Sequence, residues 1–475
     1  MPAPASASAS PHPAAPAHTD GLHGMQRIAA LIAVLIAVAM ATLDTAITNT
    51  ALPTIAGSIG ADSASVIWVV NAYQLAMVAA LLPFAALADA LGHRRVYIGG
   101  LFVFSVASLA CGLAYSLPTL AAARAFQGFG AAAVMSVNAA LIRFIFPAAK
   151  LGRGLGLNAM VVAIAFTIGP TAASLILAVT TWHWLFLVNV PLGLLAIALG
   201  WRTLPPGARG AHRFDPAAAV LCAGFFGLLI LGLGSLAHGS GWAGVLAQWA
   251  GAALCCVLLL RRQARHPAPM LALDLFRRPV FALSSLTAIC AFAAQGLAFV
   301  SLPFLLQNGF GHSQVATGFL LTPWPAIVAV MALVAGPLSD RHPAGVLCGI
   351  GLVTLGIGMA ALALLGGDAA APGTGDLVWR LLVCGAGFGF FQSPNLRAIM
   401  GSAPAARSGG ASGIVATSRL LGQTLGAALV ALCFHLWPQH GPVAALWLGC
   451  AFAVAGSAAS GMRMVVPRAA EAPAR

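Results

Sequence analysis

The chain has 475 residues, of which 60% are hydrophobic and only 7% are charged. Soluble globular proteins carry about 25% charged residues, so this composition excludes a soluble enzyme and a nucleic-acid-binding domain. The formal net charge of +13 does not alter this, because basic residues in a membrane protein report orientation through their positions rather than their sum.

Continuous apolar runs begin at Arg27 and follow one another to the end of the chain. Each has the length of about 20 residues that an α-helix needs to cross a bilayer, and none alternates as a β-barrel strand does. We therefore predict an all-α polytopic membrane protein with fourteen spans, at residues 27–56, 64–89, 95–115, 118–144, 153–179, 183–204, 215–237, 242–260, 280–307, 313–339, 343–366, 376–400, 409–435 and 441–464.

The spans divide into six, two and six. Asp89 closes the second span before a basic turn, and Asp340-Arg341 closes the tenth in the same way, an internal repeat typical of secondary transporters. We expect a disordered cytoplasmic tail at 1–26, an N-terminal six-helix bundle at 27–204, a linker with two transmembrane helices at 205–265, a C-terminal six-helix bundle at 266–464 and a cytoplasmic tail at 465–475.

Basic residues mark one side of the membrane. With the N-terminus in the cytoplasm, 20 of the 23 Lys and Arg residues fall in cytoplasmic segments. The other three, Arg124, Arg380 and Arg419, lie within spans, and no outer loop carries a basic residue. The positive-inside rule thus predicts that both termini are cytoplasmic.

Asp44 is the one acidic residue well inside a span, about 25 Å along the first helix at 1.5 Å per residue. A charge at this depth is costly and usually functional. Burial and a nearby cation act in opposite senses on a carboxyl group, so access to water or substrate can switch its charge. We therefore predict that Asp44 carries the proton, the alternative being a permanent structural pair with an arginine.

Arg124 is the expected partner of Asp44. Three- and four-residue spacings place it on one helix face together with Gln127, Ala131, Met135 and Asn138. A polar stripe on an apolar helix must face protein or water rather than lipid. The stripe indicates either a transport pathway or contacts between helices.

Other polar side chains inside spans are candidates for a substrate cavity. Arg419 is the strongest, because the acids of its half lie in loops or at span ends, and carbonyls, water or substrate must neutralise it. Lone amides in membrane helices more often serve packing. The full set expected at the cavity is Asn71, Tyr73, Gln74, Gln127, Met135, Asn138, Gln295, Gln392, Asn395, Arg419 and Gln423.

Nothing in the sequence indicates an enzyme. The nine cysteines lie in apolar spans without CxxC or metal-ligand spacing, and GxSxG, HExxH and Walker motifs are absent. We expect no metal, no cofactor and no ATP-driven pumping.

These residues carry a resemblance to the major facilitator superfamily, specifically its fourteen-helix drug:proton antiporter family. The first-span segment from Leu43 to Pro53 is similar to that family's signature, as is Arg124 with Gln127, Gly128 and Gly130. Further similar segments are Ile168-Gly169-Pro170, Trp182 to Gly193, Leu302 to Gln307, and Ser408 to Gly422.

The resemblance implies two six-helix bundles that export a small amphipathic compound from a bacterial cell across the inner membrane by alternating access, driven by protons. It implies proton coupling by Asp44 with Arg124. It also implies conformational roles for Asp89, Gly92, Arg94, Gly169, Pro170, Asp340 and Arg341. We expect Asp89 with the nearby Arg94, and Asp340 with Arg341, to latch the cytoplasmic side between the halves. We expect a monomer in the lipid bilayer whose partners are a small-molecule substrate and protons, with no nucleic acid.

Two alternatives stay open. The fold does not fix direction, so the chain could be a proton-coupled or facilitated importer of a small metabolite. A receptor or scaffold is disfavoured by the scant loops. For the substrate, we expect a cavity that holds Asp44 against Arg124 and Arg419. Its single acid, together with Asn71 where some relatives carry an Asp, favours a monovalent cationic or neutral compound and leaves open an anion held by Arg419.

Overall fold

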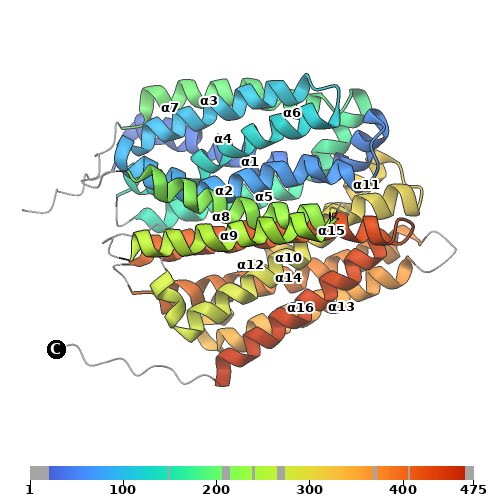
Figure 1. Ribbon diagram of the computed structural model, residues 1–475. Helices are drawn as coiled ribbons and strands as arrows, with labels where there is room; N and C mark the ends of the chain where they lie inside the picture. The colour runs from blue at the N-terminus through green and yellow to red at the C-terminus, as the bar shows by residue number, and fades with distance from the viewer. Residues whose placement is uncertain are drawn as a thin grey trace, which may run out of the picture.

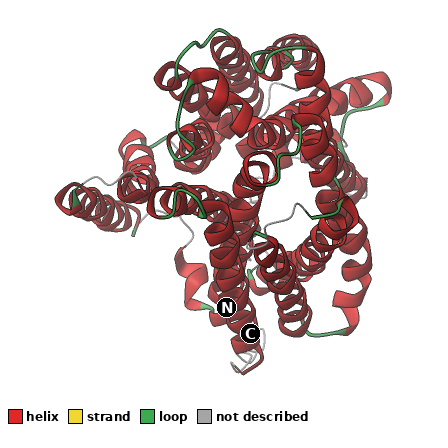
Figure 2. Cartoon of the chain, turned by 90° about the vertical axis from the view of Figure 1, so that its right-hand side faces the viewer, coloured by secondary structure: helices red, strands yellow, loops and turns green. Residues whose placement is uncertain are grey.

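The structure is a computed structural model, and it describes residues 21–147, 150–205, 214–237, 241–264, 273–366, 372–404 and 407–465. Within these ranges the secondary structure is helical, without strands, as Figure 2 shows in a view along the helices. The all-α prediction is confirmed. The predicted tails lie outside the described residues at 1–20 and 466–475, whereas α1 already begins at Gly24.

The described residues of the N-terminal half form seven α-helices and one short 3-10 turn. Gly60 ends the first helix in the left-handed conformation, at a φ of 72° that glycine adopts without strain. Ser116 and Thr119 form a capping box that starts the fourth helix. The elements are α1 (Gly24–Ile59), η1 (Ser65–Ile67), α2 (Trp68–Leu91), α3 (His93–Gly112), α4 (Leu117–Ile145), α5 (Leu151–Val179), α6 (Trp184–Leu187) and α7 (Asn189–Thr203).

The linker pair and the C-terminal half supply the rest. The first helix of the C-terminal half ends in a π-helical turn, labelled η4. The elements are α8 (Pro216–Ala237), α9 (Trp242–Gln263), η3 (Leu273–Arg277), α10 (Pro279–Phe304), η4 (Leu305–Gly309), α11 (Gln314–Leu321), α12 (Pro323–Arg341), α13 (Ala344–Leu365), α14 (Thr374–Ser402), α15 (Ser408–Leu436) and α16 (Gly441–Val465).

Each predicted span corresponds to a helix or a broken helix. Among the described residues, 13 helical segments are long and apolar enough to cross a membrane. The 29-residue helix α14, which carries Asp376, Arg380 and Arg397, completes the expected fourteen. Two spans are interrupted: α6 passes into α7 at Val188, and α11 into α12 at Thr322, just before a proline that cannot continue the hydrogen-bond ladder.

The two halves form separate bundles, α1–α7 and α10–α16, and the pair α8–α9 packs on α2 and α15 (Figure 1). Corresponding glycines let the fourth helix of each bundle approach the second closely. A Cβ on Gly128 of α4 would lie 2.3 Å from the Tyr73 carbonyl oxygen, and one on Gly389 of α14 2.6 Å from that of Val328. The two bundles thus share the same close helix packing, as the internal sequence repeat predicts.

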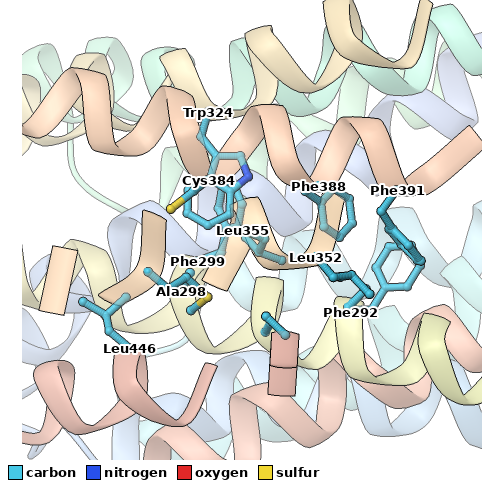
Figure 3. Close-up of a cluster of buried hydrophobic side chains, with 14 of the residues drawn as sticks. Phe292, Ala298, Phe299, Trp324, Leu352, Leu355, Cys384, Phe388, Phe391 and Leu446 are labelled. Atoms are coloured by element: carbon cyan, nitrogen blue, oxygen red, sulfur yellow. The ribbon is translucent and has the colours of Figure 1, made fainter. Parts of the chain in front are cut away.

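A dense aromatic cluster fills the C-terminal bundle (Figure 3). Phe292 and Phe388 pack edge to face with centroids 5.3 Å apart, and Phe299 and Trp324 do so at 5.2 Å. A second apolar cluster crosses between the bundles, joining α1 residues such as Leu52 to residues of α10 and α15. Its members lie toward the ends that the positive-inside rule assigns to the outside, so it holds the halves together there.

Candidate functional site

Asp44 and Arg124 form a buried ion pair within the N-terminal bundle, each with 1% of its side chain exposed. Arg124 Nη1 donates to Asp44 Oδ2 at 2.5 Å. The other carboxylate oxygen accepts from Gln127 Nε2 at 2.8 Å and from Asn189 Nδ2 at 3.0 Å. Three donors surround the carboxyl group, which is the arrangement of an ionised carboxylate.

Neutral groups also hold the guanidinium of Arg124. Its Nε donates to the carbonyl oxygen of Val69 at 3.0 Å, and its Nη1 also donates to Gln127 Oε1 at 2.6 Å. The ring of Tyr73 lies 4.2 Å from the guanidinium carbon. Arg124 therefore keeps hydrogen-bond and cation–π partners that do not depend on the charge of Asp44.

Sequence reasoning missed two members of this site. Asn189 begins α7 and lies in a segment that carried the family resemblance, so an asparagine at the break of the sixth span was a usable signal. Ser108 on α3 accepts a hydrogen bond from Gln127 Nε2 at 2.9 Å. A serine in an apolar helix gives no such signal, because most bond their own backbone.

A cavity of about 370 Å³ lies between the two bundles. Seven of the residues predicted at a substrate cavity are on its wall: Tyr73, Gln74, Met135, Gln295, Gln392, Arg419 and Gln423. The rest of the wall is mostly apolar. It consists of Ala41, Thr42, Thr45, Met77, Ala159, Val162, Ala163, Phe166, Phe292, Pro325, Val328, Ala329, Ala332, Phe388, Ser393, Leu396 and Leu420.

Four residues predicted at the cavity are not on its wall. Gln127 is engaged with the buried ion pair, and Asn71 is buried at 2% exposure. Asn138 donates to Asn158 of α5 at 3.0 Å. Asn395 accepts from Arg463 Nη1 at 2.9 Å. The prediction that these four residues line the cavity is therefore wrong. Gln127, Asn138 and Asn395 instead make hydrogen bonds between or within helices, the common role of amides in membrane helices, whereas Asn71 Oδ1 is buried without a hydrogen-bond partner.

Asp44 is not on the cavity wall either. The wall includes its neighbours Thr42 and Thr45, while its own carboxyl group faces into the bundle toward Arg124. Tyr73 links the two sites, because it lines the cavity and also lies against Arg124.

Arg419 is the one charged residue among the described residues that line the cavity. Its Nε is buried without a hydrogen-bond partner, and no ion pair involves it in the described part of the chain. One turn further along α15, Gln423 Nε2 donates to Gln295 Oε1 at 3.4 Å. The cavity therefore has a cation and two amides close together on a mostly apolar wall.

The turn between α2 and α3 holds three of the predicted conformational residues. Gly92 has a φ of 99°, which favours glycine. Asp89 pairs with His93 at 3.5 Å rather than with Arg94, which donates to the carbonyl oxygen of Trp201 on α7. These contacts stay within the N-terminal bundle, so the predicted latch from Asp89 and Arg94 to the other half is wrong in this state.

The equivalent turn in the C-terminal half departs from prediction in the same way. Asp340 pairs with Arg397 of α14 and not with its neighbour Arg341. Both partners lie at the end of one bundle, with about half of each side chain exposed. No ion pair among the described residues crosses between the bundles at this end.

Gly169 and Pro170 lie where α5 meets both α1 and α11. A Cβ on Gly169 would be 2.4 Å from Cβ of Ala46, and one on Gly318 of α11 would be 2.3 Å from the carbonyl oxygen of Pro170. Close by, the hydroxyls of Thr171 and Thr322 are 2.6 Å apart. The bundles are thus closed on the outer side of the cavity.

Two bundles around a central cavity, with a buried acid–arginine pair beside it, define a polytopic membrane transporter. The sequence matches the Major Facilitator Superfamily over residues 34–427, and the chain belongs to that family. This confirms the superfamily named from the motifs.

Relatives agree with this assignment. The chain is 49% identical over 451 residues to the uncharacterized transporter YebQ of Escherichia coli (strain K12), covering 94% of this chain and 98% of that protein. It is 31% identical to the riboflavin transporter RibZ of Clostridioides difficile (strain 630), covering 86% and 88%. It is 34% identical to the multidrug resistance protein Stp of Mycobacterium tuberculosis (strain CDC 1551 / Oshkosh), covering 86% and 76%.

The fold is also found in solved structures. A POT family transporter crystallised with a thioalcohol-conjugated peptide superposes with a TM-score of 0.70 and 13% identity, covering 90% of this chain and 94% of that one. At this identity the likeness concerns the fold alone.

Proposed function

We propose that the protein is a proton-driven antiporter that exports small amphipathic compounds across the bacterial inner membrane, acting as a monomer by alternating access. The observation that carries the proposal is the buried Asp44–Arg124 pair directly behind the cavity wall. An intramembrane acid at such a position is typical of a proton pathway. The 34% identity to a multidrug resistance protein supports export.

Protonation of Asp44 changes the net charge of the Asp44–Arg124 pair but leaves the other contacts of Arg124 in place. A neutral carboxyl group no longer attracts Arg124, which keeps its bonds to Val69 and Gln127. The change reaches the cavity through Tyr73, and it reaches the outer closure through α1, since Ala46 packs against Gly169. One proton moving inward through 100 mV releases ~2.3 kcal/mol, which is available for the export step.

Asp44→Asn in proteoliposomes tests the proposal. The amide keeps the shape of the carboxyl group but cannot carry a proton, so we expect loss of proton-driven efflux with retained exchange of labelled substrate. Asp62→Asn is the matched control, because Asp62 is exposed and only caps the backbone N–H groups of Ala64 and Ser65. Undiminished proton-driven efflux in the Asp44 variant would remove the residue from the mechanism.

Infrared titration provides a second test. The carboxyl band of Asp44, identified by its loss in Asp44→Asn, should move between its ionised and neutral positions as the cavity changes its open side. A band that stays ionised with either side open contradicts the proposal.

Proton-coupled uptake is the second candidate, and Arg419 favours it. A proton on Asp44 leaves Arg124 uncompensated, which adds positive charge beside a cavity that already holds Arg419. An anionic solute would then bind better together with the proton than without it, which is the linkage of a symporter. Efflux accelerated by an inward proton gradient supports antiport, and accelerated uptake supports symport.

A further inference from the structure

We infer that the cavity binds a small organic anion, with Arg419 receiving its carboxylate or sulfonate and the apolar wall receiving an aromatic body. This rests on the proposed transport function and concerns the charge of its substrate. It reverses the preference for a cation drawn from the sequence, which assumed that Asp44 shares the cavity.

Within the described ranges, every acidic residue is engaged by groups other than Arg419. Seven of the ten acidic residues lie in the described ranges, and six of them pair with other bases. The seventh, Asp62, accepts backbone N–H groups in an outer loop. A permanent cation facing a mostly apolar cavity therefore has its counter-charge supplied from the cavity itself.

The surroundings of Arg419 suit a planar anion. Its unpartnered Nε and the other guanidinium N–H groups can bind both oxygens of a carboxylate at once. The amides of Gln423 and Gln295 share one long hydrogen bond, of 3.4 Å. Their remaining side-chain N–H groups can therefore donate to the oxygens of the same anion. A cationic ligand would find no carboxylate on the described wall and would be repelled by Arg419.

The remaining wall defines the body of the ligand. Phe166, Phe292 and Phe388 face the cavity, and the last two pack edge to face. The volume of about 370 Å³ is at the small end of ligand sites, which run from ~300 Å³ upward. A ligand with one or two rings and one anionic group fits this combination of size, aromatic contact and charge.

Equilibrium binding to the purified full chain in phosphatidylcholine nanodiscs tests the inference. The probe is radiolabelled 2-naphthoate, with 2-naphthamide and 2-naphthylmethylammonium as neutral and cationic competitors of the same ring. We expect the anion to bind at least tenfold more tightly than the cation. Equal or tighter binding of the cation would overturn the inference.

Variants assign the preference to one residue. Arg419→Gln should weaken 2-naphthoate binding at least tenfold, whereas Arg419→Lys, which keeps the charge, should retain the order of anion over cation. Arg262→Gln is the control, because it removes an exposed arginine of the linker pair, outside the cavity. Unchanged binding in Arg419→Gln, with its melting temperature preserved, would also overturn the inference.

Charge movement separates this inference from the proposed function. Export of a monoanion against one proton moves two positive charges inward, whereas symport of the same pair moves none. A valinomycin-set potential, negative inside, should therefore drive 2-naphthoate efflux. If 2-naphthoate binds tightly but its flux does not depend on the potential, antiport is refuted and the anion site stands. If the protein is a proton-driven antiporter without preference for the anion, the anion site is refuted and antiport stands.

Discussion

The two halves of the transporter treat a buried arginine in opposite ways. In the N-terminal bundle, Arg124 is paired with Asp44 inside a closed set of hydrogen bonds. In the C-terminal bundle, Arg419 lies on the cavity wall, and no acidic residue in the described part of the chain pairs with it. A carboxylate paired with an arginine inside one bundle can take up and release a proton. An unpaired arginine on the cavity wall instead interacts directly with the bound substrate. The repeat thus conserves the backbone arrangement and divides the chemistry between its copies.

The largest expected effect comes from breaking the matched pair. Arg124→Gln leaves the buried carboxylate without its cation, which should lower the free energy of unfolding by about 3–5 kcal/mol and abolish proton coupling. The measurement is reversible unfolding of the purified protein together with proton-driven flux. The double variant with Asp44→Asn removes both charges and should recover part of the stability; a double variant no more stable than the single one would mean that the pair is not the cause.

Supplying the missing acid would make the second half resemble the first. Gln423→Glu places a carboxylate one turn from Arg419, where the two can pair across the helix face. We expect 2-naphthoate affinity to fall at least tenfold and 2-naphthylmethylammonium to become the preferred ligand. Gln423→Leu is the control without charge. An unchanged order of ligands in Gln423→Glu would show that charge does not set the preference.

The smallest effect is expected at the linker pair. The hydrogen bond from Arg262 holds the pKa of Asp215 below its usual value. A lowered pKa stabilises the fold above the unfolded pKa of about 3.9, and this contribution is lost as pH falls through the native value. Arg262→Gln should therefore lower the melting temperature slightly at pH 7 and by progressively less as the pH falls below about 3.9, with transport unchanged. A loss that stays constant as the pH falls would point to packing rather than charge.

The sequence predicted the spans and the Asp44–Arg124 pair for the same reason. Charge and backbone polarity are so costly in lipid that a lone acid at mid-span must find a cation. It did not predict Asn189 and Ser108 at that site, or Arg397 as the partner of Asp340, because several faces of an apolar helix are equally possible before packing is known. The same limit explains why the sequence placed Asp44 in the cavity. The sequence predicts how deep a residue lies along its helix, but not how the helix is rotated about its axis and hence which way the side chain points.

The outer closure has a consequence for how the transporter resets. Among the described residues, two polar links cross between the bundles there: the hydroxyl pair of Thr171 with Thr322, and the hydrogen bond from the Ser174 hydroxyl to the carbonyl oxygen of Gln314. Each of these groups exchanges its partner for a water molecule at almost no enthalpic cost. The rate at which the bundles separate there should consequently depend on how readily water enters this apolar interface. It should depend very little on ionic strength.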